Sequence, residues 1–101
     1  MIKHVVMWKL KDFAEDADRE RNAKRIKIEL ESLRQLIPQI FHLEVGINIL
    51  KSDAAYDVVL LSVFKNEDDL DFYQNHPDHR AVAEFVNKVK ESRIVVDYRT
   101  R

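Results

Sequence analysis

The sequence predicts an α+β protein with a ferredoxin-like split βαβ fold, in which helices cover one face of a four-stranded antiparallel sheet. Two observations predict it. Strand-like and helix-like segments follow one another in the order β-α-β-β-α-β, and the length of 101 residues with 46% apolar residues suits one core, so we expect a single domain over residues 1–101. The middle strands are apolar on both faces, which on a small domain usually marks an interface. We therefore expect a homodimer in which two sheets face each other.

The first third of the chain predicts a strand followed by a helix. Residues 2–10 alternate with a period of two, so that one face carries Ile2, His4, Val6, Trp8 and Leu10. Residues 11–18 are polar and contain Asp16 and Asp18, either of which can cap a helix. A helix is predicted to follow this polar segment and to end at Pro38. Its core-facing side is an apolar stripe with steps of three and four residues, made of Ala23, Ile26, Leu30, Leu33 and Ile37.

The rest of the chain predicts two strands, a broken helix and a last strand. Residues 40–50 alternate in polarity, whereas residues 56–64 are apolar on both faces, as in a strand buried from both sides. Asn66 can cap the next helix. That helix breaks at His76-Pro77 and begins again at the proline, which suits a first helical turn because its missing N–H costs nothing there. Residues 93–98 form the closing strand.

Composition excludes several classes of function. The net charge of −1 argues against a nucleic-acid or anionic-membrane partner bound through bulk charge. The absence of cysteine excludes disulfides, thiol catalysis and cysteine-based zinc sites. A single glycine excludes a glycine-rich phosphate loop. No signal peptide or membrane-length apolar run is seen, so a cytoplasmic location is the default expectation.

The segment YQNHPDH holds two of the four histidines of the chain and is the candidate site. Helical spacing puts His79 on the apolar stripe of its helix, and Tyr73 points inward by the same rule. If the His4 face of the first strand meets the helices, these three side chains converge. A histidine there could take a proton from a carbon acid or hydroxyl, and the tyrosine could donate a hydrogen bond to the resulting oxyanion.

Two other interpretations of this segment stay open. An inward histidine is often a core residue whose ring is hydrogen-bonded to the backbone or to a tyrosine. Alternatively, His76 and His79 could share a divalent ion with Asp78, although no HExxH pattern is present and we assign no metal site. His76 itself lies at the helix break, where it could cap the helix that follows.

The chain resembles one known family over essentially its whole length. The residues that carry the resemblance are the opening IKHVVMWKLKD, LIP at 36–38, YQNHPDH, and the closing VVDYRTR. They are similar to those of the stress-responsive dimeric α+β barrel (Dabb) proteins. The resemblance implies a ferredoxin-like protomer that dimerises through its sheet into an α+β barrel.

A plant member of that family, olivetolic acid cyclase, closes a linear polyketide by an intramolecular aldol reaction, and the resemblance extends to it. The resemblance implies His79 as base, Tyr73 as its partner and His4 as a further pocket histidine. Leu30 and Val58 stand where the cyclase has a pocket tyrosine and a pocket histidine, so the lining differs. We expect Leu30, Val58, Trp8 and His76 to contact a ligand.

Three functions are therefore carried forward. The first is a homodimer with a hydrophobic pocket for a small aromatic or carbonyl compound and a general role such as stress response. The second is a cofactor-independent lyase, cyclase, isomerase or monooxygenase that uses His79, Tyr73 and His4. The third is a structural, stress-protective assembly that needs no pocket. None of the three requires a cofactor, a nucleic acid or a membrane.

Overall fold

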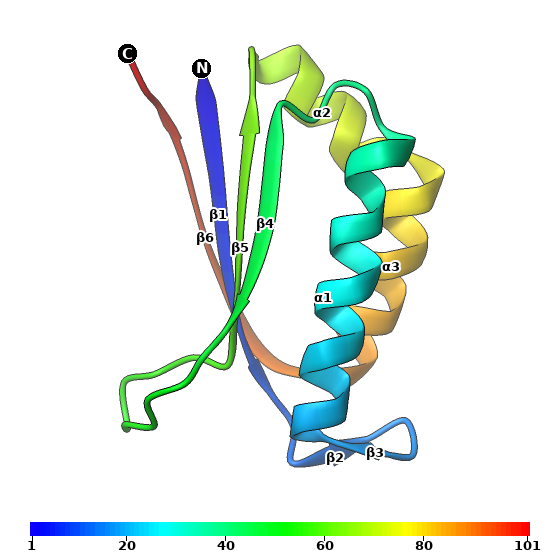
Figure 1. Ribbon diagram of the computed structural model, residues 1–101, viewed down its shortest axis with the longest axis vertical. Helices are drawn as coiled ribbons and strands as arrows, with labels where there is room; N and C mark the ends of the chain where they lie inside the picture. Colours follow the sequence, from blue (N-terminus) through cyan, green and yellow to red (C-terminus); the bar gives the residue numbers. More distant parts are fainter.

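The computed structural model describes residues 1–101 as one curved sheet with helices on a single face (Figure 1). The sheet has the order β4-β5-β1-β6 and every neighbouring pair is antiparallel. Its strands are β1 (Ile2–Leu10), β4 (His42–Ile47), β5 (Val58–Phe64) and β6 (Lys90–Arg99). The helices are α1 (Arg19–Leu36), α2 (Glu67–Asn75) and α3 (Pro77–Val89). This is the predicted ferredoxin-like split βαβ arrangement.

The segment between β1 and α1 contains a small hairpin that the sequence analysis describes only as polar. Strands β2 (Phe13–Ala14) and β3 (Ala17–Asp18) pair across a two-residue turn. Glu15 and Asp16 form that turn with φ angles of 50° and 60°. Positive φ at both turn residues matches the right-handed twist of a two-residue hairpin. The turn places Asp18 at the start of α1, where its Oδ1 accepts the N–H of Arg21 at 2.8 Å.

Three predicted boundaries are corrected. The strand expected over 40–50 forms only over His42–Ile47, because the chain then leaves the sheet, and Ile49 is 88% exposed. The strand expected from 56 begins at Val58. The last helix ends at Val89, and β6 starts at Lys90 rather than at 93.

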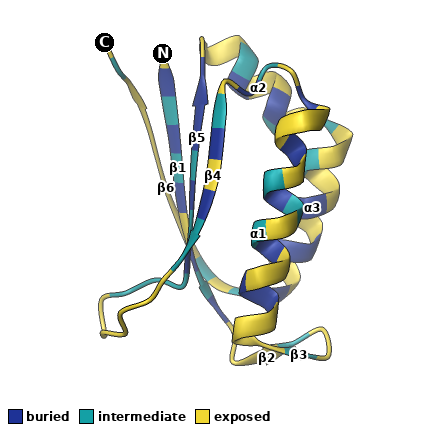
Figure 2. Ribbon diagram, viewed as in Figure 1, coloured by how far each residue is buried: buried dark blue, intermediate teal, exposed yellow.

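The core lies between the sheet and the helices, where Figure 2 shows the buried residues gathered on the facing surfaces. On β1 the buried side chains are Ile2, His4, Val6, Trp8 and Leu10. This settles the orientation that the sequence leaves open, because the face that carries His4 is the one that meets the helices. None of the helices is long and apolar enough to cross a bilayer.

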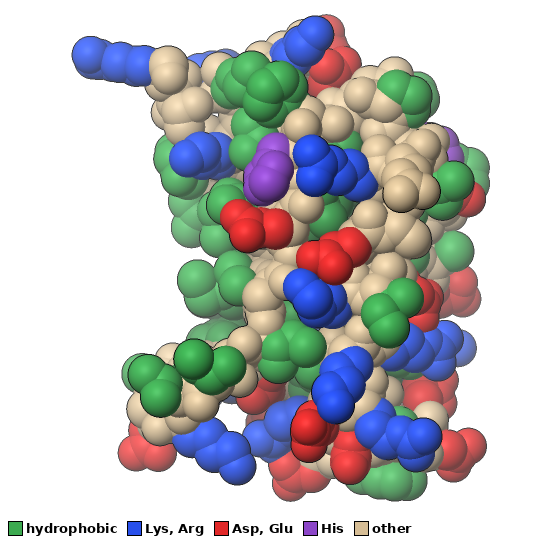
Figure 3. All heavy atoms as spheres, viewed as in Figure 1, with side chains coloured by type: hydrophobic (Ala, Val, Ile, Leu, Met, Phe, Trp, Pro, Cys, Tyr) green, Lys and Arg blue, Asp and Glu red, His purple; other side chains and the backbone are tan.

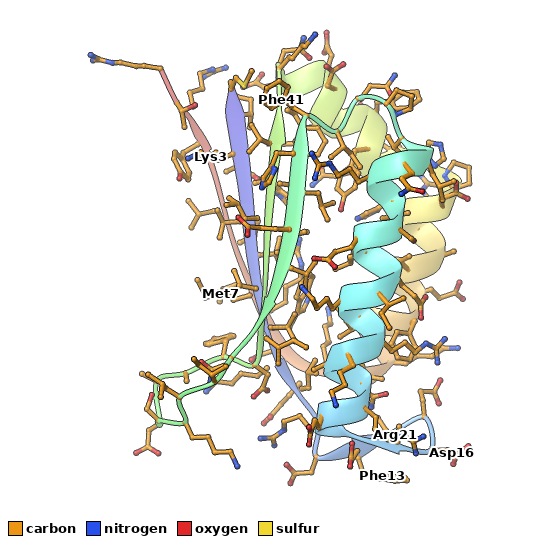
Figure 4. All side chains as sticks on the ribbon, in the orientation of Figure 1. Lys3, Met7, Phe13, Asp16, Arg21 and Phe41 are labelled. Carbon is orange, nitrogen blue, oxygen red and sulfur yellow. The ribbon has the colours of Figure 1, made fainter.

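The opposite face of the sheet carries no helix, and we call it the outer sheet face. Figure 4 shows Lys3 and Met7 of β1 pointing to this side, away from the helices. The strand register aligns its side chains in rows, one of which joins Leu61, Val5 and Val96 across β5, β1 and β6. Val96 is 62% exposed although it stands in the middle of β6. An apolar row of this kind on an uncovered face favours association.

Candidate functional site

The candidate site is a cavity of about 280 Å³ between the sheet and the helices. Strand β1 supplies one wall and α3 supplies the facing wall, while single residues of α1 and β5 and the first residues of β6 complete it. Two large side chains near this space, Trp8 and Phe85, do not fill it. Trp8 forms part of a wall, and Phe85 is not part of the lining. The eleven lining residues are His4, Val6, Trp8, Leu30, Leu60, His79, Ala83, Val86, Asn87, Lys90 and Arg93.

His79 reaches this cavity from the first turn of α3, and the helix break before it fixes its ring. In a continuous helix the N–H of Asp78 would donate to the carbonyl of Gln74. Here that N–H donates instead to Nδ1 of His76 at 3.1 Å, because His76 caps α3. The free carbonyl of Gln74 lies 3.2 Å from Nδ1 of His79. Since a carbonyl only accepts, Nδ1 carries the proton and Nε2 keeps its lone pair.

The surroundings of His79 favour its neutral form. Burial lowers the pKa of the imidazole below its ordinary value, because the charged ring loses hydration. The hydrogen bond to Gln74 acts in the opposite direction and is the smaller effect. Electrostatic interactions with His4, Arg93 and His76 lower the pKa of His79 further. A neutral imidazole with a free Nε2 lone pair is the form that accepts a proton near pH 7.

Tyr73 lies beside His79 and is completely buried. Its ring centroid is 4.4 Å from that of His79 and 6.4 Å from that of His4. Its hydroxyl has no hydrogen-bond partner in the protein. Burial raises the pKa of this phenol well above its ordinary value, so the hydroxyl stays protonated and can donate. A buried, unsatisfied donor costs folding free energy, and such groups in native proteins usually have a functional or solvent partner.

His4 meets a carboxylate that the sequence analysis does not identify. Its Nδ1 lies 2.5 Å from Oδ1 of Asp97, its register partner on β6. The carboxylate accepts the Nδ1 proton, which orients the ring and leaves Nε2 of His4 for the interior. His4 is 2% exposed, so this bond also satisfies a buried polar group. The signal that could have found Asp97 is the antiparallel pairing of the first and last strands.

The structure brings some of the expected site residues together and separates others. His4, His79, Trp8 and Leu30 line the cavity, whereas Tyr73 is not part of the lining and packs with its ring beside His79. Val58 is buried in the core outside the lining, and His76 caps α3 with its ring against Phe72. No group of three or more His, Asp or Glu side chains is arranged to hold a metal ion.

Three polar lining residues are missing from the sequence analysis. Asn87 lies two turns along α3 from His79, and Lys90 and Arg93 lie at the start of β6. The predicted last strand began only at residue 93, so it left Lys90 outside the sheet. It also did not say which residue of β1 lies opposite Arg93. The observed start at Lys90 puts Arg93 opposite Trp8, which is its register partner.

The chain was compared with models of known protein families. The model of the stress responsive A/B barrel domain, Dabb, matches residues 2–100. Two Arabidopsis thaliana proteins described as containing a stress-response A/B barrel domain are 31% and 33% identical to this chain, and each alignment covers 97% of it. The chain spans 46% of the first and 36% of the second, less than half the length of either relative.

Solved structures share the fold over nearly the whole chain. A dimeric ferredoxin-like protein of unknown function from Bacteroides fragilis has a TM-score of 0.83 at 34% identity, covering 98% of this chain and 95% of its own. The hydroxynitrile lyase of Passiflora edulis has a TM-score of 0.79 at 15% identity, covering 96% and 90%. At the lower identity the likeness concerns the fold alone. The predicted ferredoxin-like fold is confirmed by these neighbours.

Proposed function

Since this chain belongs to the stress-responsive A/B barrel (Dabb) family, we propose that it binds a small aromatic or carbonyl compound in the cavity between its sheet and α3, as part of a stress response. The cavity itself is the observation that carries this proposal. It has a volume of about 280 Å³, and six of its eleven lining residues are apolar, the others being His4, His79, Asn87, Lys90 and Arg93. Apolar walls with a few placed polar groups are typical of small-molecule sites.

Binding can be tested with acetophenone, which combines an aromatic ring with a carbonyl group. We expect acetophenone to shift the backbone amide NMR signals of α3 and β1 around the cavity. The control is Ala83→Trp, which fills the space from α3. The proposal fails if acetophenone and a panel of similar ketones leave the wild-type spectrum unchanged, or shift the Ala83→Trp spectrum equally.

A second function is favoured by one specific observation, the bond between Nδ1 of His79 and the carbonyl of Gln74. It supports a role for Nε2 of His79 as a general base toward a bound carbonyl compound. In the proposed step, Nε2 removes a proton from the carbon next to the carbonyl. The C–H electrons form a C=C bond, and the carbonyl π electrons move to oxygen. The hydroxyl of Tyr73 is the proposed donor to this enolate oxygen, which requires the ketone to reach past the lining to a completely buried side chain beside His79.

The enolate so formed has several fates that share this step. It can attack a second carbonyl, as in an aldol cyclisation of the kind that olivetolic acid cyclase performs, or it can regain a proton. The hydroxynitrile lyase of Passiflora edulis shows that this fold can carry lyase chemistry, but its identity to this chain is only 15%. The step that these reactions share is therefore the one to test.

Proton removal is measured as deuterium uptake at the methyl group of acetophenone in D₂O. We expect uptake above the buffer rate with the wild type, and a loss of about 100-fold with His79→Gln. His76→Asn is the matched control, because asparagine keeps the cap of α3 and His76 lies outside the cavity. If both variants behave like the wild type, His79 is a core histidine and the base role is dropped.

We further propose that two copies associate through the outer sheet face and close an α+β barrel. Neighbouring structures such as that from Bacteroides fragilis are dimeric. Figure 3 shows apolar side chains along the sheet side of the molecule and on the projecting loop between β4 and β5. The exposed apolar residues of this region are Met7, Ile49, Leu50, Ile94, Val96 and Tyr98. A mass in solution of twice the 12.0 kDa chain is the expected result.

A further inference from the structure

We propose that the cavity selects an anionic ligand, an elongated aromatic carbonyl compound whose carboxylate is held by Arg93 and Lys90 while its carbonyl group lies at His79. This inference rests on the proposed function, and it specifies the ligand class. It predicts a molecule with two polar ends of different chemistry, joined by an apolar body.

The first support is the charge of the lining. Lys90 and Arg93 are its two formal cations, and no aspartate or glutamate belongs to it. The chain as a whole carries a net charge of −1, so this excess of positive charge is local to the cavity. A cavity lined by one sign of charge and walled by apolar side chains concentrates ligands of the opposite sign.

The second support is that neither cation has a partner within the protein. Neither Lys90 nor Arg93 takes part in any ion pair of the structure. Neither side chain donates a hydrogen bond to another residue. Lys88, on the last turn of α3, instead has Glu15 at 3.7 Å. The guanidinium of Arg93 therefore keeps its paired donors free for a ligand carboxylate, which it can hold with two parallel bonds.

The third support is the arrangement of the polar groups along the cavity. On β1, His4 and Trp8 are four residues apart, about 13 Å along the strand, and their partners on β6 are Asp97 and Arg93. On α3, Asn87 follows His79 by eight residues, about 12 Å along the helix axis. These are separations of the backbone positions, and the long side chain of Arg93 spans part of this distance, because its charge still acts on His79.

The middle of the cavity is apolar. The residues between its two ends are Val6, Leu30, Leu60, Ala83 and Val86. A ligand that reaches both ends must therefore bury an apolar body of about one ring, with its anion and its carbonyl on opposite sides.

The test compares 4-acetylbenzoate with its methyl ester, which keeps the ring and the ketone but lacks the charge. We expect the wild type to bind the acid at least about tenfold more tightly than the ester in calorimetry. Arg93→Gln and Lys90→Gln should each remove most of this preference. Lys88→Gln, which removes a lysine outside the lining, is the matched control. Added salt should weaken the acid alone.

The outcomes separate this inference from the proposed function. Equal binding of acid and ester overturns the charge preference and leaves the binding function standing. A preference for the acid that survives both Arg93→Gln and Lys90→Gln, or that persists in Ala83→Trp, places the anion elsewhere and also overturns it. Binding of neither compound, together with no binding of acetophenone, removes the proposed function and this inference with it.

Discussion

Asp97 holds His4 across two neighbouring strands, with Oδ1 of the carboxylate 2.5 Å from Nδ1 of the ring. Asparagine in place of Asp97 can either donate to Nδ1 or accept from it, so the tautomer of His4 would no longer be fixed. We expect Asp97→Asn to lower the free energy of unfolding by about 1 kcal/mol. Nitrogen-15 NMR of the imidazole should show a mixture of tautomers. Unchanged ring shifts would contradict this account of the pair.

Tyr73→Phe separates a structural tyrosine from a functional one. The hydroxyl has no partner in the protein, so its removal should leave stability unchanged or raise it by about 1 kcal/mol, as measured by urea unfolding. Deuterium uptake by a bound ketone should nevertheless fall about 100-fold, because the enolate oxygen loses its donor. A marked loss of stability without an effect on uptake would mean that the hydroxyl serves only packing.

The pH dependence of stability should contain a contribution from His79. Its pKa in the folded protein lies below the ordinary value of 6.5, so the unfolded chain binds more protons between the two values. The free energy of unfolding therefore falls as pH drops below about 6.5 and levels off below the lowered pKa of the folded state. His79→Gln should remove this part of the pH dependence. Urea unfolding between pH 4.5 and 8 for both proteins measures it, and parallel curves would count against the burial effect.

Val96→Lys tests the proposed dimer. A lysine in the middle of the outer sheet face would put a charge into the apolar interface, so the protein should become monomeric in sedimentation velocity while its circular dichroism stays the same. The control is Ile28→Lys, because Ile28 is an equally apolar residue on α1 and is 70% exposed. A dimer that survives Val96→Lys and dissociates with Ile28→Lys would place the interface on the helices.

Element types were predictable because the patterns that set them are local. The period of two in β1, the stripe on α1, the cap at Asn66 and the break at Pro77 all depend on residues close in sequence, and the structure has each of them. The ends of strands were less predictable where they depend on pairing with a neighbouring strand. Ile49 continues an alternating pattern, yet it lies outside the sheet because β5 begins only at Val58 and offers it no partner.

The candidate site was predictable only in part for the same reason. Helical spacing predicted that Tyr73 and His79 point inward, whereas the place of His4 depended on which face of β1 meets the helices, and the sequence left that open. Asp97 and Arg93 come from the strand that pairs with β1 from the far end of the chain, and their place depends on a register that no local pattern gives. The role of the Gln74 carbonyl could not be predicted either. It is free to accept from His79 only because the N–H of Asp78 donates to His76 instead.

The break between α2 and α3 also makes the length of this segment a constraint. Each helical residue turns the chain by about 100°, so one residue inserted between Pro77 and His79 would swing the imidazole out of the cavity. It would also move Nδ1 away from the carbonyl of Gln74. Substitutions within the segment change single contacts, whereas an insertion or deletion displaces the whole proton-accepting group. Among proteins with this fold, the spacing between tyrosine, proline and histidine should therefore vary less than the residues that fill it.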